Sequence, residues 1–544
     1  MSAEQATGRP YDVIIVGAGP TGLVLANLLG GQGVSTLVIE RNPTTVQEPR
    51  AVSIDDESLR TVQASGMLES VMGGVVAGYG SRYLTPQGKC FLTVLPSGRP
   101  YGHSRRNAFR QPDFESRMRE GLNRFPHITA LFGWEVQSFH QDAEGVEVTI
   151  SGEGETRAVQ GRFLVGADGA SSFVRKQLGI ALEGETIPER WLIVDLENSP
   201  AERDTVVFCD IERPCIALPG PNLTRRFEFK LFRGEDEAAL LQPDNVQRLL
   251  QSRGVAPGSR IVRQTVYTFH ARLAAKWTVG RVFLAGDAAH LTPPFAGQGM
   301  NSGVRDAHNL AWKLAEVTSG RLPERLLESY ELERRDHVAA MIELALRMGR
   351  IMGPSSKLSG WLTQTAFRVA GIWPPLRSYF GEMKYKPKPR FEAGFIVPSS
   401  QPLVGRLLPQ PVIADAVHGE RLLDDALPPG FVLFGVGVTP TALAGAAKAF
   451  ETTRLTPNLV TLNAPADPAV IPSVRQVITQ GVAPGDLLAA NGMMLLVRPD
   501  RYVMAAFAPG DATQIAAAVR NLTGGREAPN SQDLTVPRTA VTAR

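Results

Sequence analysis

One segment near the N-terminus constrains the fold more than any other part of the chain: YDVIIVGAGPTGLVLANLLGGQGVSTLVIER, residues 11–41. The β-branched run at 13–16 predicts a buried parallel strand, and apolar residues at helical spacing over 23–29 predict a helix. A second strand over 36–39 ends in Glu40, whose carboxylate can accept both hydroxyls of an adenosine ribose. Strand, helix, strand and acid together predict a βαβ unit that binds a dinucleotide.

Three glycines between the first strand and the helix have separate roles in such a unit. Gly17 permits the tight turn, Gly19 lets the backbone approach a pyrophosphate, and Gly22 lets the helix pack closely on the strand. A glycine turn without a ligand is the alternative, and the complete unit around these residues disfavours it. The pattern does not by itself separate NAD from FAD.

Two later segments repeat the pattern of an apolar strand that runs into glycine and aspartate. They are RFLVGADGASSFVRKQLGI at 162–180, with Asp168, and GRVFLAGDAAHLTPPFAGQGMNSGVRDAHNLAWKLA at 280–315, with Asp287. Each strand ends at the carboxyl edge of a sheet, where α/β proteins bind ligands. Asp287 can hold a sugar-alcohol hydroxyl, and the glycine-rich turn after it can present N–H groups to a phosphate or a ring oxygen. A long cofactor held at both ends is the expected ligand.

These three segments resemble the fingerprints of FAD-dependent aromatic hydroxylases, the single-component flavoprotein monooxygenases with the p-hydroxybenzoate hydroxylase fold. Their order and spacing match along 11–345, with PRAVSIDDESLR at 49–60 and FRQPDFESRMREGL at 109–122 as further support. Within the family, the pattern is most similar to 3-(3-hydroxyphenyl)propionate hydroxylases. The resemblance implies FAD as cofactor, NADH or NADPH and O2 as co-substrates, and ortho hydroxylation of a phenolic acid through a flavin C4a-hydroperoxide.

The resemblance also implies which residues bind the cofactor. Glu40 and the first glycines would hold the ADP half, Arg50 and Gln111 would lie near the pyrophosphate and ribityl chain, and Asp168 would also serve reaction with the nicotinamide nucleotide. The full set of expected cofactor-binding residues is Gly17, Gly19, Pro20, Thr21, Gly22, Glu40, Arg41, Arg50, Gln111, Asp168, Gly169, Asp287, Pro294, Gly297, Gly299, Met300 and Asn301.

Residues that contact the substrate are harder to predict. A phenol can be activated by any of several kinds of polar group that face the flavin, so no single motif identifies the residue. The candidates near the substrate or the flavin are His103, Arg105, Tyr267, His270 and Pro294, with Arg106 and Arg272 as further arginines. For each of them a solvated loop or strand residue is the alternative. His290 is interpreted as a structural, hydrogen-bonded histidine, and the acids at 55–57 as caps of a helix N-terminus.

The predicted fold class is α/β: a Rossmann-like FAD-binding domain, an inserted mixed β-sheet substrate domain and a C-terminal thioredoxin-like domain. The last resembles the C-terminal domain of phenol hydroxylase, with VRPDRYVMAAF as its most characteristic stretch, and no cysteine follows Cys215, so a redox role is not expected. The expected boundaries are 1–75, 105–180 and 276–345 for FAD binding, 76–104 and 181–275 for substrate, 346–395 for a helical connection, 396–524 for the thioredoxin-like domain and 525–544 for a disordered tail.

Charge and cysteine content exclude other classes of protein. The 57 basic and 54 acidic residues give a net charge of +3, too balanced for a nucleic-acid partner. The three cysteines form no CxxC pair, which gives no basis for a disulfide framework or a metal site. Without a recognisable signal peptide or membrane segment, a cytoplasmic protein is expected, and a homodimer is compatible with the sequence.

Several alternatives remain open from the sequence. A hydroxylase that tailors a larger polycyclic or polyketide phenol is the second candidate. A flavin halogenase is disfavoured because no WxW arrangement occurs, and a dithiol flavin reductase because no cysteine pair occurs. A non-catalytic flavin- or ligand-binding module is the alternative from another class.

Overall fold

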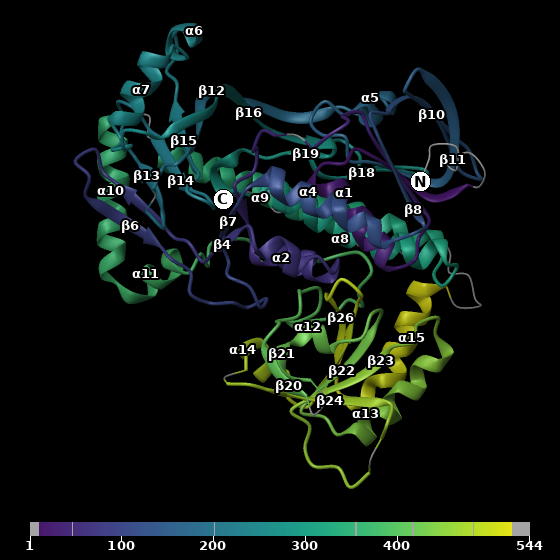
Figure 1. The fold of residues 1–544 in the computed structure, drawn as a ribbon. Helices are drawn as coiled ribbons and strands as arrows, with labels where there is room; N and C mark the ends of the chain where they lie inside the picture. The colour runs from purple at the N-terminus through teal and green to yellow at the C-terminus, as the bar shows by residue number, and fades with distance from the viewer. Residues whose placement is uncertain are drawn as a thin grey trace. The chain divides into compact units, whose positions relative to one another are not determined.

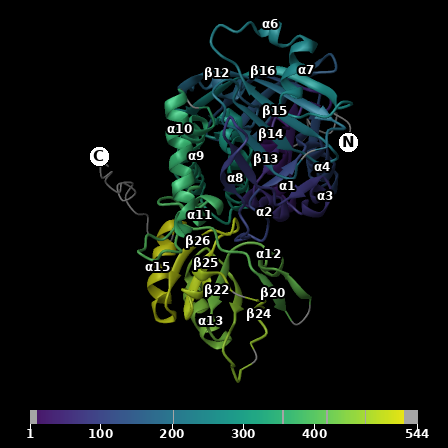
Figure 2. The ribbon, with the colours of Figure 1, turned by 90° about the vertical axis from the view of Figure 1, so that its left-hand side faces the viewer.

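The computed structural model describes residues 10–524 except 46, 201, 354, 355, 416, 417, 470 and 482. The chain forms two compact units, Met1–Thr318 with Tyr330–Pro389 and Ser319–Ser329 with Arg390–Arg544. Both contain helices and mixed sheets, which confirms the predicted α/β class (Figures 1 and 2). The tail predicted at 525–544 lies outside the described residues.

The first sheet of the first unit contains the predicted βαβ unit. Its strands run in the order β17-β18-β11-β1-β2-β8, and the central pairs are parallel, with β9 and β10 added beside β11. The strands are β1 (Tyr11–Val16), β2 (Thr36–Glu40), β8 (Ile128–Phe132), β9 (Glu135–Gln141), β10 (Val146–Gly152), β11 (Glu155–Gly166), β17 (Thr278–Val279) and β18 (Val282–Leu284). The carboxyl ends of β1, β11 and β18 therefore lie together, as the repeated sequence pattern predicts.

Close backbone packing fixes the loop after β1. Gly17 has a φ of +104°, and a Cβ there would lie 2.9 Å from the Cα of Asp168. A Cβ on Gly22 would collide with the carbonyl oxygen of Gly17. The first two fingerprint loops thus pack directly on one another. Helix α1 (Pro20–Gly31) follows and packs beside α8 (Gly299–Thr318), as Figure 1 shows.

The second sheet of this unit runs in the order β19-β16-β12-β15-β14-β13-β5-β6. Its strands are β5 (Ser81–Leu84), β6 (Cys90–Val94), β12 (Leu182–Glu197), β13 (Thr205–Phe208), β14 (Cys215–Pro219), β15 (Arg225–Lys230), β16 (Arg260–Ala274) and β19 (His290–Leu291). One face packs Leu192, Phe227 and Phe229 against α7 (Pro243–Gln251). The other face carries Trp191 and Ile193 with further apolar residues. Part of this second face is covered by Phe295, Met348 and Phe367, and part of it lines a cavity.

Further elements complete the first unit. A small sheet pairs β3 (Ser53–Ile54), β7 (Asn107–Phe109) and β4 (Val75–Ala77). The remaining helices up to residue 389 are α2 (Asp56–Ala64), α3 (Leu68–Met72), α4 (Gln111–Gly121), α5 (Phe173–Gln177), α6 (Glu237–Leu240), α9 (Ser329–Met352), α10 (Lys357–Ile372) and α11 (Pro374–Gly381). Helices α10 and α11 pack on β6, so most of the stretch expected as a connection belongs to this unit.

The second unit is built on one seven-stranded sheet with the order β21-β20-β24-β23-β22-β25-β26. Strand β22 pairs in parallel with β23 and antiparallel with β25, which pairs antiparallel with β26. Its elements are β20 (Val412–Asp415), β21 (Gly419–Leu422), α12 (Leu423–Ala426), β22 (Val432–Val436), α13 (Pro440–Ala447), β23 (Asn458–Leu462), β24 (Val474–Thr479), α14 (Gly485–Leu488), β25 (Met493–Val497), β26 (Val503–Phe507) and α15 (Ala512–Thr523). This βαβ unit followed by a hairpin and a helix is the predicted thioredoxin-like arrangement.

Two polar interactions stabilise the second unit at its ends. Arg498 and Asp500, within the stretch VRPDRYVMAAF, are buried and form a bidentate pair with distances of 2.6 and 3.0 Å. Arg325 donates hydrogen bonds to the carbonyl groups of Asn521 and Leu522. This contact accounts for the grouping of 319–329 with the C-terminal residues, whereas the sequence pattern predicts that this stretch belongs to the FAD-binding domain. Among the described residues, no helix is long and apolar enough to span a membrane.

Asp306 on α8 connects three parts of the first unit. Its carboxylate lies 2.7 Å from Nε2 of His290 and accepts hydrogen bonds from Nε of Arg334 at 2.9 Å and from the backbone N–H of Gly286 at 3.1 Å. All three side chains are fully or almost fully buried, and the arginine and imidazole hold the pKa of Asp306 below its usual range against the effect of burial. His290 is therefore the structural residue that the sequence predicted.

The substitution Asp306→Asn should destabilise the protein by about 3 kcal/mol, because it leaves the buried Arg334 guanidinium without its carboxylate. The free energy of unfolding from urea titration measures this effect. Glu343→Gln on α9 removes an exposed ion pair with Arg347 and should cost less than about 0.5 kcal/mol. Equal losses in the two variants would contradict the role given to Asp306.

Candidate active site

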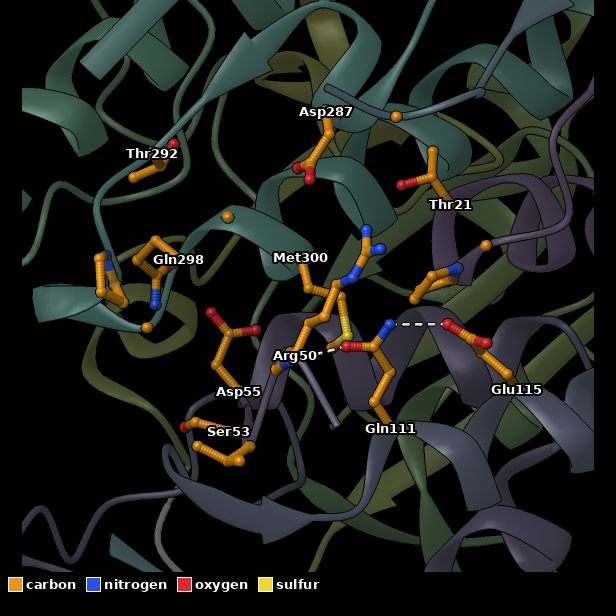
Figure 3. Close-up of a pocket in the computed structure, with 18 of the residues that line it drawn as sticks. Thr21, Arg50, Ser53, Asp55, Gln111, Glu115, Asp287, Thr292, Gln298 and Met300 are labelled. Atoms are coloured by element: carbon orange, nitrogen blue, oxygen red, sulfur yellow. Dashed lines mark hydrogen bonds between the residues drawn. The ribbon is translucent and has the colours of Figure 1, made fainter. Parts of the chain in front are cut away.

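A cavity of about 490 Å³ runs through the first unit from the glycine loop after β1 to the apolar face of the second sheet. Its walls come from both sheets, from the loop before α8 and from α9. Figure 3 shows its middle, where Arg50, Asp287 and Gln111 point into one space. The cavity is elongated and polar at one end and apolar at the other, so it can hold a long cofactor and a small ligand beside it.

The first end of the cavity is lined by the loop after β1 and the carboxyl end of β2. Glu40 accepts a hydrogen bond from the backbone N–H of Ala18 at 2.8 Å and from that of Asn42 at 2.9 Å. No described atom would lie within 4 Å of a Cβ on Gly19, so the backbone there is open to a ligand. Gly22 does not line the cavity, because its space is taken by the Gly17 carbonyl group.

Three carboxyl groups and an amide line the middle of the cavity. Asp287 is exposed to the cavity yet enclosed by the protein, so desolvation raises its pKa. No described residue donates a hydrogen bond to it. Asp168 accepts one hydrogen bond from the backbone N–H of Val174 at 3.1 Å, while its buried Oδ1 has no partner among the described residues. Gln111 donates to Glu115 at 2.7 Å. These groups are positioned to accept hydroxyl and amide donors from a ligand.

Arg50 lies on a segment that the second sheet holds in place. Arg226 on β15 donates to the carbonyl oxygen of Arg50 at 2.7 Å and also contacts that of Pro49. The same guanidinium pairs with the buried Asp195 on β12 at 2.7 Å. Arg263 on β16 donates to the Pro49 carbonyl oxygen at 3.0 Å. The second sheet therefore positions Arg50, one of the residues expected to bind the cofactor. The sequence pattern did not indicate this contact.

The loop before α8 forms the wall opposite the second sheet. Pro294, Gly297, Gly299 and Met300 line the cavity, and Gly297 has a left-handed φ of +62°. Asn301 does not line it. Its amide donates to the carbonyl oxygen of Gly297 at 2.7 Å and accepts from the backbone N–H of Asp55 at 3.0 Å. Asn301 thus holds the loop in shape rather than contacting a ligand.

The second sheet lines the far end of the cavity with two rows of side chains. Neighbouring strands place Glu228, Ile216, Val207 and Tyr83 side by side, because these residues pair directly across β15, β14, β13 and β5. The second row, two residues away on each strand, is Arg226, Leu218, Thr205 and Ser81. Leu344, Met348 and Met352 of α9 add apolar surface. This chamber is suited to a flat, mostly apolar ring.

Arg106 is one of the cations that line this chamber. It contacts Ser81 Oγ, donates to the Tyr79 hydroxyl at 3.3 Å, and lies 4.4 Å above the Tyr79 ring. Tyr79 and Tyr83 help to raise its pKa against the effect of burial. It forms no ion pair with a described carboxylate. A half-buried guanidinium in this state is suited to bind an acidic group of a ligand.

Comparison with known proteins identifies the family. A family model described as "FAD binding domain" matches residues 10–345, and one described as "HcaD C-terminal domain" matches 405–522. The chain belongs to the FAD-dependent aromatic hydroxylases. It is 38% identical over 525 residues to the 3-(3-hydroxy-phenyl)propionate/3-hydroxycinnamic acid hydroxylase of Klebsiella pneumoniae (strain 342), covering 93% of each chain. It is 40% identical over 443 residues to the enzyme of that name from Escherichia coli O8 (strain IAI1), covering 80% of each chain.

Solved structures of related proteins have the same fold. The flavin-dependent monooxygenase PieE, in complex with FAD and substrate, matches with a TM-score of 0.79 and 21% identity, over 95% of this chain and 100% of that chain. OxyS anhydrotetracycline hydroxylase from Streptomyces rimosus matches with a TM-score of 0.73 and 27% identity, over 95% and 99%. This hydroxylase is therefore an FAD-dependent aromatic monooxygenase with the predicted fold.

The residues of the cavity fit FAD. The open backbone at Gly19, the unpartnered Oδ1 of Asp168 and the enclosed, unpartnered carboxyl of Asp287 are what a cofactor with phosphates and many hydroxyls requires. Of the seventeen residues expected to bind the cofactor, the cavity is lined by Gly17, Gly19, Pro20, Thr21, Glu40, Arg41, Arg50, Gln111, Asp168, Gly169, Asp287, Pro294, Gly297, Gly299 and Met300. Gly22 and Asn301 instead shape the loops around it.

The residues expected near the substrate divide into two groups. Arg105 and Pro294 line the cavity, and Arg105 donates to the backbone carbonyl group of Glu382. His103, Tyr267 and His270 do not line it.

Each of the three has another partner. His103 bonds to Gln63 at 3.1 Å, His270 bonds to Thr186 at 3.0 Å, and Tyr267 stacks on Phe269 at the edge of the sheet. His270 points to the opposite face of its strand, whereas Tyr267 shares the face of Trp191 but lies outside the cavity, and the sequence indicated neither.

A buried ionic cluster lies at the start of α2. Asp55 caps the helix by accepting from the backbone N–H of Ser58 at 3.0 Å, as predicted. Asp55 and Glu57 also pair with Arg305, and Lys386 reaches both at 3.0 and 2.9 Å. The carboxyl groups at 55–57 lie within 4.8 Å of one another, but two cations already pair with Asp55 and Glu57. Burial raises the pKa of Asp56, the third acid, to about 7. The cluster holds α2, α8 and the segment around Lys386 together beside the cavity.

The substitution Asp287→Ala should lower FAD affinity by about 10- to 100-fold, since a hydrogen bond to a charged group contributes about 1.5–3 kcal/mol. Quenching of flavin fluorescence on titration of the apoprotein measures the dissociation constant. Asp244→Ala, at an exposed position on α7, should leave it unchanged. A variant at 287 that retains full FAD affinity would overturn the assignment of this residue.

Proposed function

We propose that this protein hydroxylates a phenolic acid of the 3-(3-hydroxyphenyl)propionate type next to the existing hydroxyl group. The observation that carries the proposal is Arg106, a guanidinium that faces the apolar chamber beside the cofactor end without a described carboxylate partner. The names of the Klebsiella and Escherichia relatives, which are hydroxylases of such acids, support the same substrate class.

The chain's own residues would divide the work as follows. FAD, when bound, would supply the redox chemistry, which comprises oxidation of NADH or NADPH and activation of O2. Glu40, Arg50, Asp168 and Asp287 would hold the cofactor through its hydroxyls and phosphates. The apolar row of Ile216 and its neighbours on the sheet would exclude water from the ring that reacts.

Arg106 would orient the substrate by binding its carboxylate. The Tyr79 hydroxyl, which donates to Ser53 Oγ at 2.8 Å, holds the aromatic ring under the guanidinium. An arginine fixed in this way loses little conformational entropy on binding an anion. The acid arm at Arg106 would leave the aromatic ring over the apolar part of the chamber, between β5 and the loop before α8.

The proposal also assigns separate roles to the two large sheets of the first unit. We assign the sheet around β1 to the cofactor and the sheet around β15 to the substrate, with the thioredoxin-like unit in a structural role. The cysteines Cys90, Cys209 and Cys215 all lie outside that unit. A homodimer and a cytoplasmic location stay predictions of the sequence.

Oxidation of NADH and NADPH by the FAD-loaded protein, with peroxide and hydroxylated product quantified together, tests the proposal. A phenolic acid should accelerate oxidation with product equal to nucleotide consumed. If only a polycyclic phenol does so, a tailoring hydroxylase is the better assignment. If no phenol is hydroxylated, the protein is a flavin- or ligand-binding module and the proposal is wrong.

The substitution Arg106→Met should raise KM for 3-(3-hydroxyphenyl)propionate by about 10- to 100-fold, because a charge-assisted hydrogen bond is lost. For 3-ethylphenol, which lacks the carboxylate, KM should hardly change. Arg82→Met is the matched control, since Arg82 follows Ser81 on β5 and its side chain lies on the opposite face of the sheet from the chamber. An equal rise in KM for both phenols in the Arg106 variant would show that its role is structural.

A further inference from the structure

Glu228 is a buried carboxyl group that forms no ion pair or hydrogen bond with the described residues. It lies on β15 opposite Ile193 of β12 and Ile216 of β14, and its side chain is on the face of the sheet that lines the chamber. The residue is only 6% exposed. It accepts no hydrogen bond from the described residues. Burying an unpaired carboxyl group costs free energy, so a structural role does not account for it.

The nearest cation does not need Glu228 as a counter-ion. Arg226, two residues away on the same strand, forms its ion pair with Asp195 at 2.7 Å and donates to the Arg50 carbonyl oxygen. Glu228 therefore points from the sheet into the chamber, and its carboxylate is available to accept a proton. The next residues of the same row, Ile216 and Val207, do not form hydrogen bonds through their side chains, and Tyr83 lies beyond them at the end of the row.

The surroundings of Glu228 favour its neutral form over part of the physiological pH range. Burial raises its pKa to about 7, with Arg226 opposing this effect and Asp195 adding to it. The strands around Glu228 carry further titratable groups. Arg225 and Lys230 lie on β15, and Glu189 and Arg190 lie earlier on β12. Cys215 on β14 lies on the opposite face of the sheet, and Tyr83 lies on β5 at the end of the same row. The opposite wall, residues 292–300, carries no ionisable side chain. A group with such a pKa can take a proton at neutral pH and release it again.

Glu228 and Arg106 stand at opposite sides of the chamber. Glu228 is on β15, whereas the Ser81 that contacts Arg106 is on β5, and β14 and β13 lie between them. Three strand spacings of about 4.8 Å separate the two strands, about 14 Å in total. The distance between the carboxyl group and the guanidinium is smaller than this, because both side chains extend into the chamber. An aromatic ring with an acidic arm on one side and a hydroxyl group on the other can bridge two such groups.

We propose that Glu228 is the catalytic residue that accepts the proton of the substrate's phenolic hydroxyl group. The O–H bond breaks, the proton moves to a carboxylate oxygen of Glu228, and the electron pair stays on the phenolate oxygen. The phenolate donates electron density to the ring carbon beside it, which makes that carbon a better nucleophile toward activated oxygen. The proton returns to solvent when the product leaves. This inference rests on the proposed function.

The variant Glu228→Gln tests the inference, because the amide has the same shape and cannot accept the proton. The rate of hydroxylation should fall by about 100-fold or more. In the unchanged protein, activity should fall as the pH decreases through about 7, because the carboxylate becomes protonated, and this dependence should disappear in the variant. FAD content and affinity for the methyl ether of the substrate, which has no phenolic proton, should be unchanged.

Proton uptake gives a second readout that does not depend on turnover. A nitrophenol analogue, 3-(3-hydroxy-4-nitrophenyl)propionate, is added as its phenolate above pH 7, with a pH indicator in weak buffer. The unchanged protein should take up protons, to a maximum of about one per site, because the phenolate raises the pKa of Glu228 further, and Glu228→Gln should take up none. Equal uptake in both proteins would overturn the proposal.

Control variants separate the possible failures. Glu189→Gln, on the same sheet, removes a carboxylate that is paired with Lys230 at 3.2 Å and should behave as the unchanged protein. Glu228→Asp should keep the pH dependence at a lower rate, which decides the case if the glutamine variant does not fold. If the unchanged protein hydroxylates a phenolic acid and Glu228→Gln does so at the same rate and pH profile, the inference is wrong and the proposed function stands. If the unchanged protein hydroxylates no phenol, both are wrong.

Discussion

The buried pair of Arg226 and Asp195 is the interaction on which the site depends. The guanidinium joins two strands of the second sheet through Asp195 and, through the Pro49 and Arg50 carbonyl groups, binds the segment that follows β2. A buried charge pair is costly to form unless its remaining donors are satisfied, and here backbone carbonyl groups satisfy them. The pair therefore fixes the distance between the cofactor end of the cavity and the sheet that faces the substrate.

Two further polar networks hold the remaining walls. The carboxylate of Asp306 joins α8 to α9 and to the turn at Gly286, and the cluster around Asp55 and Lys386 joins α2 to α8. Each network is buried and contains both signs of charge. Because such groups lose much of their stabilisation when one partner moves, the loops around the cavity are held in one arrangement before any ligand binds. This preorganisation leaves Asp168, Asp287, Arg106 and Glu228 free to act on ligands.

The sequence was most informative where backbone geometry decides. Glycines at 17, 19 and 22 and the acid at 40 identified the βαβ unit, because only glycine permits the positive φ at 17 and the close contact of 22 with its neighbour. The resemblance to flavin-dependent hydroxylases, carried by these segments, implied seventeen cofactor-binding residues, of which fifteen line the cavity. It was less informative for His103, Tyr267 and His270, whose distance from a fingerprint along the chain says nothing of the direction in which their side chains point.

By itself, then, the sequence determined the dinucleotide-binding unit and the order of the units, since these depend on local spacing of glycines, acids and apolar runs, and its resemblance to a known family implied FAD. Only the tertiary structure decided which polar residues meet. Glu228 lies in a strand with an ordinary alternating pattern, and only its cross-strand pairing with Ile193 and Ile216 puts it in the chamber. Arg106 and Glu228 are more than a hundred residues apart, and the sheet order alone brings them to one cavity. Contacts between distant strands arise from register and topology, which no short motif encodes.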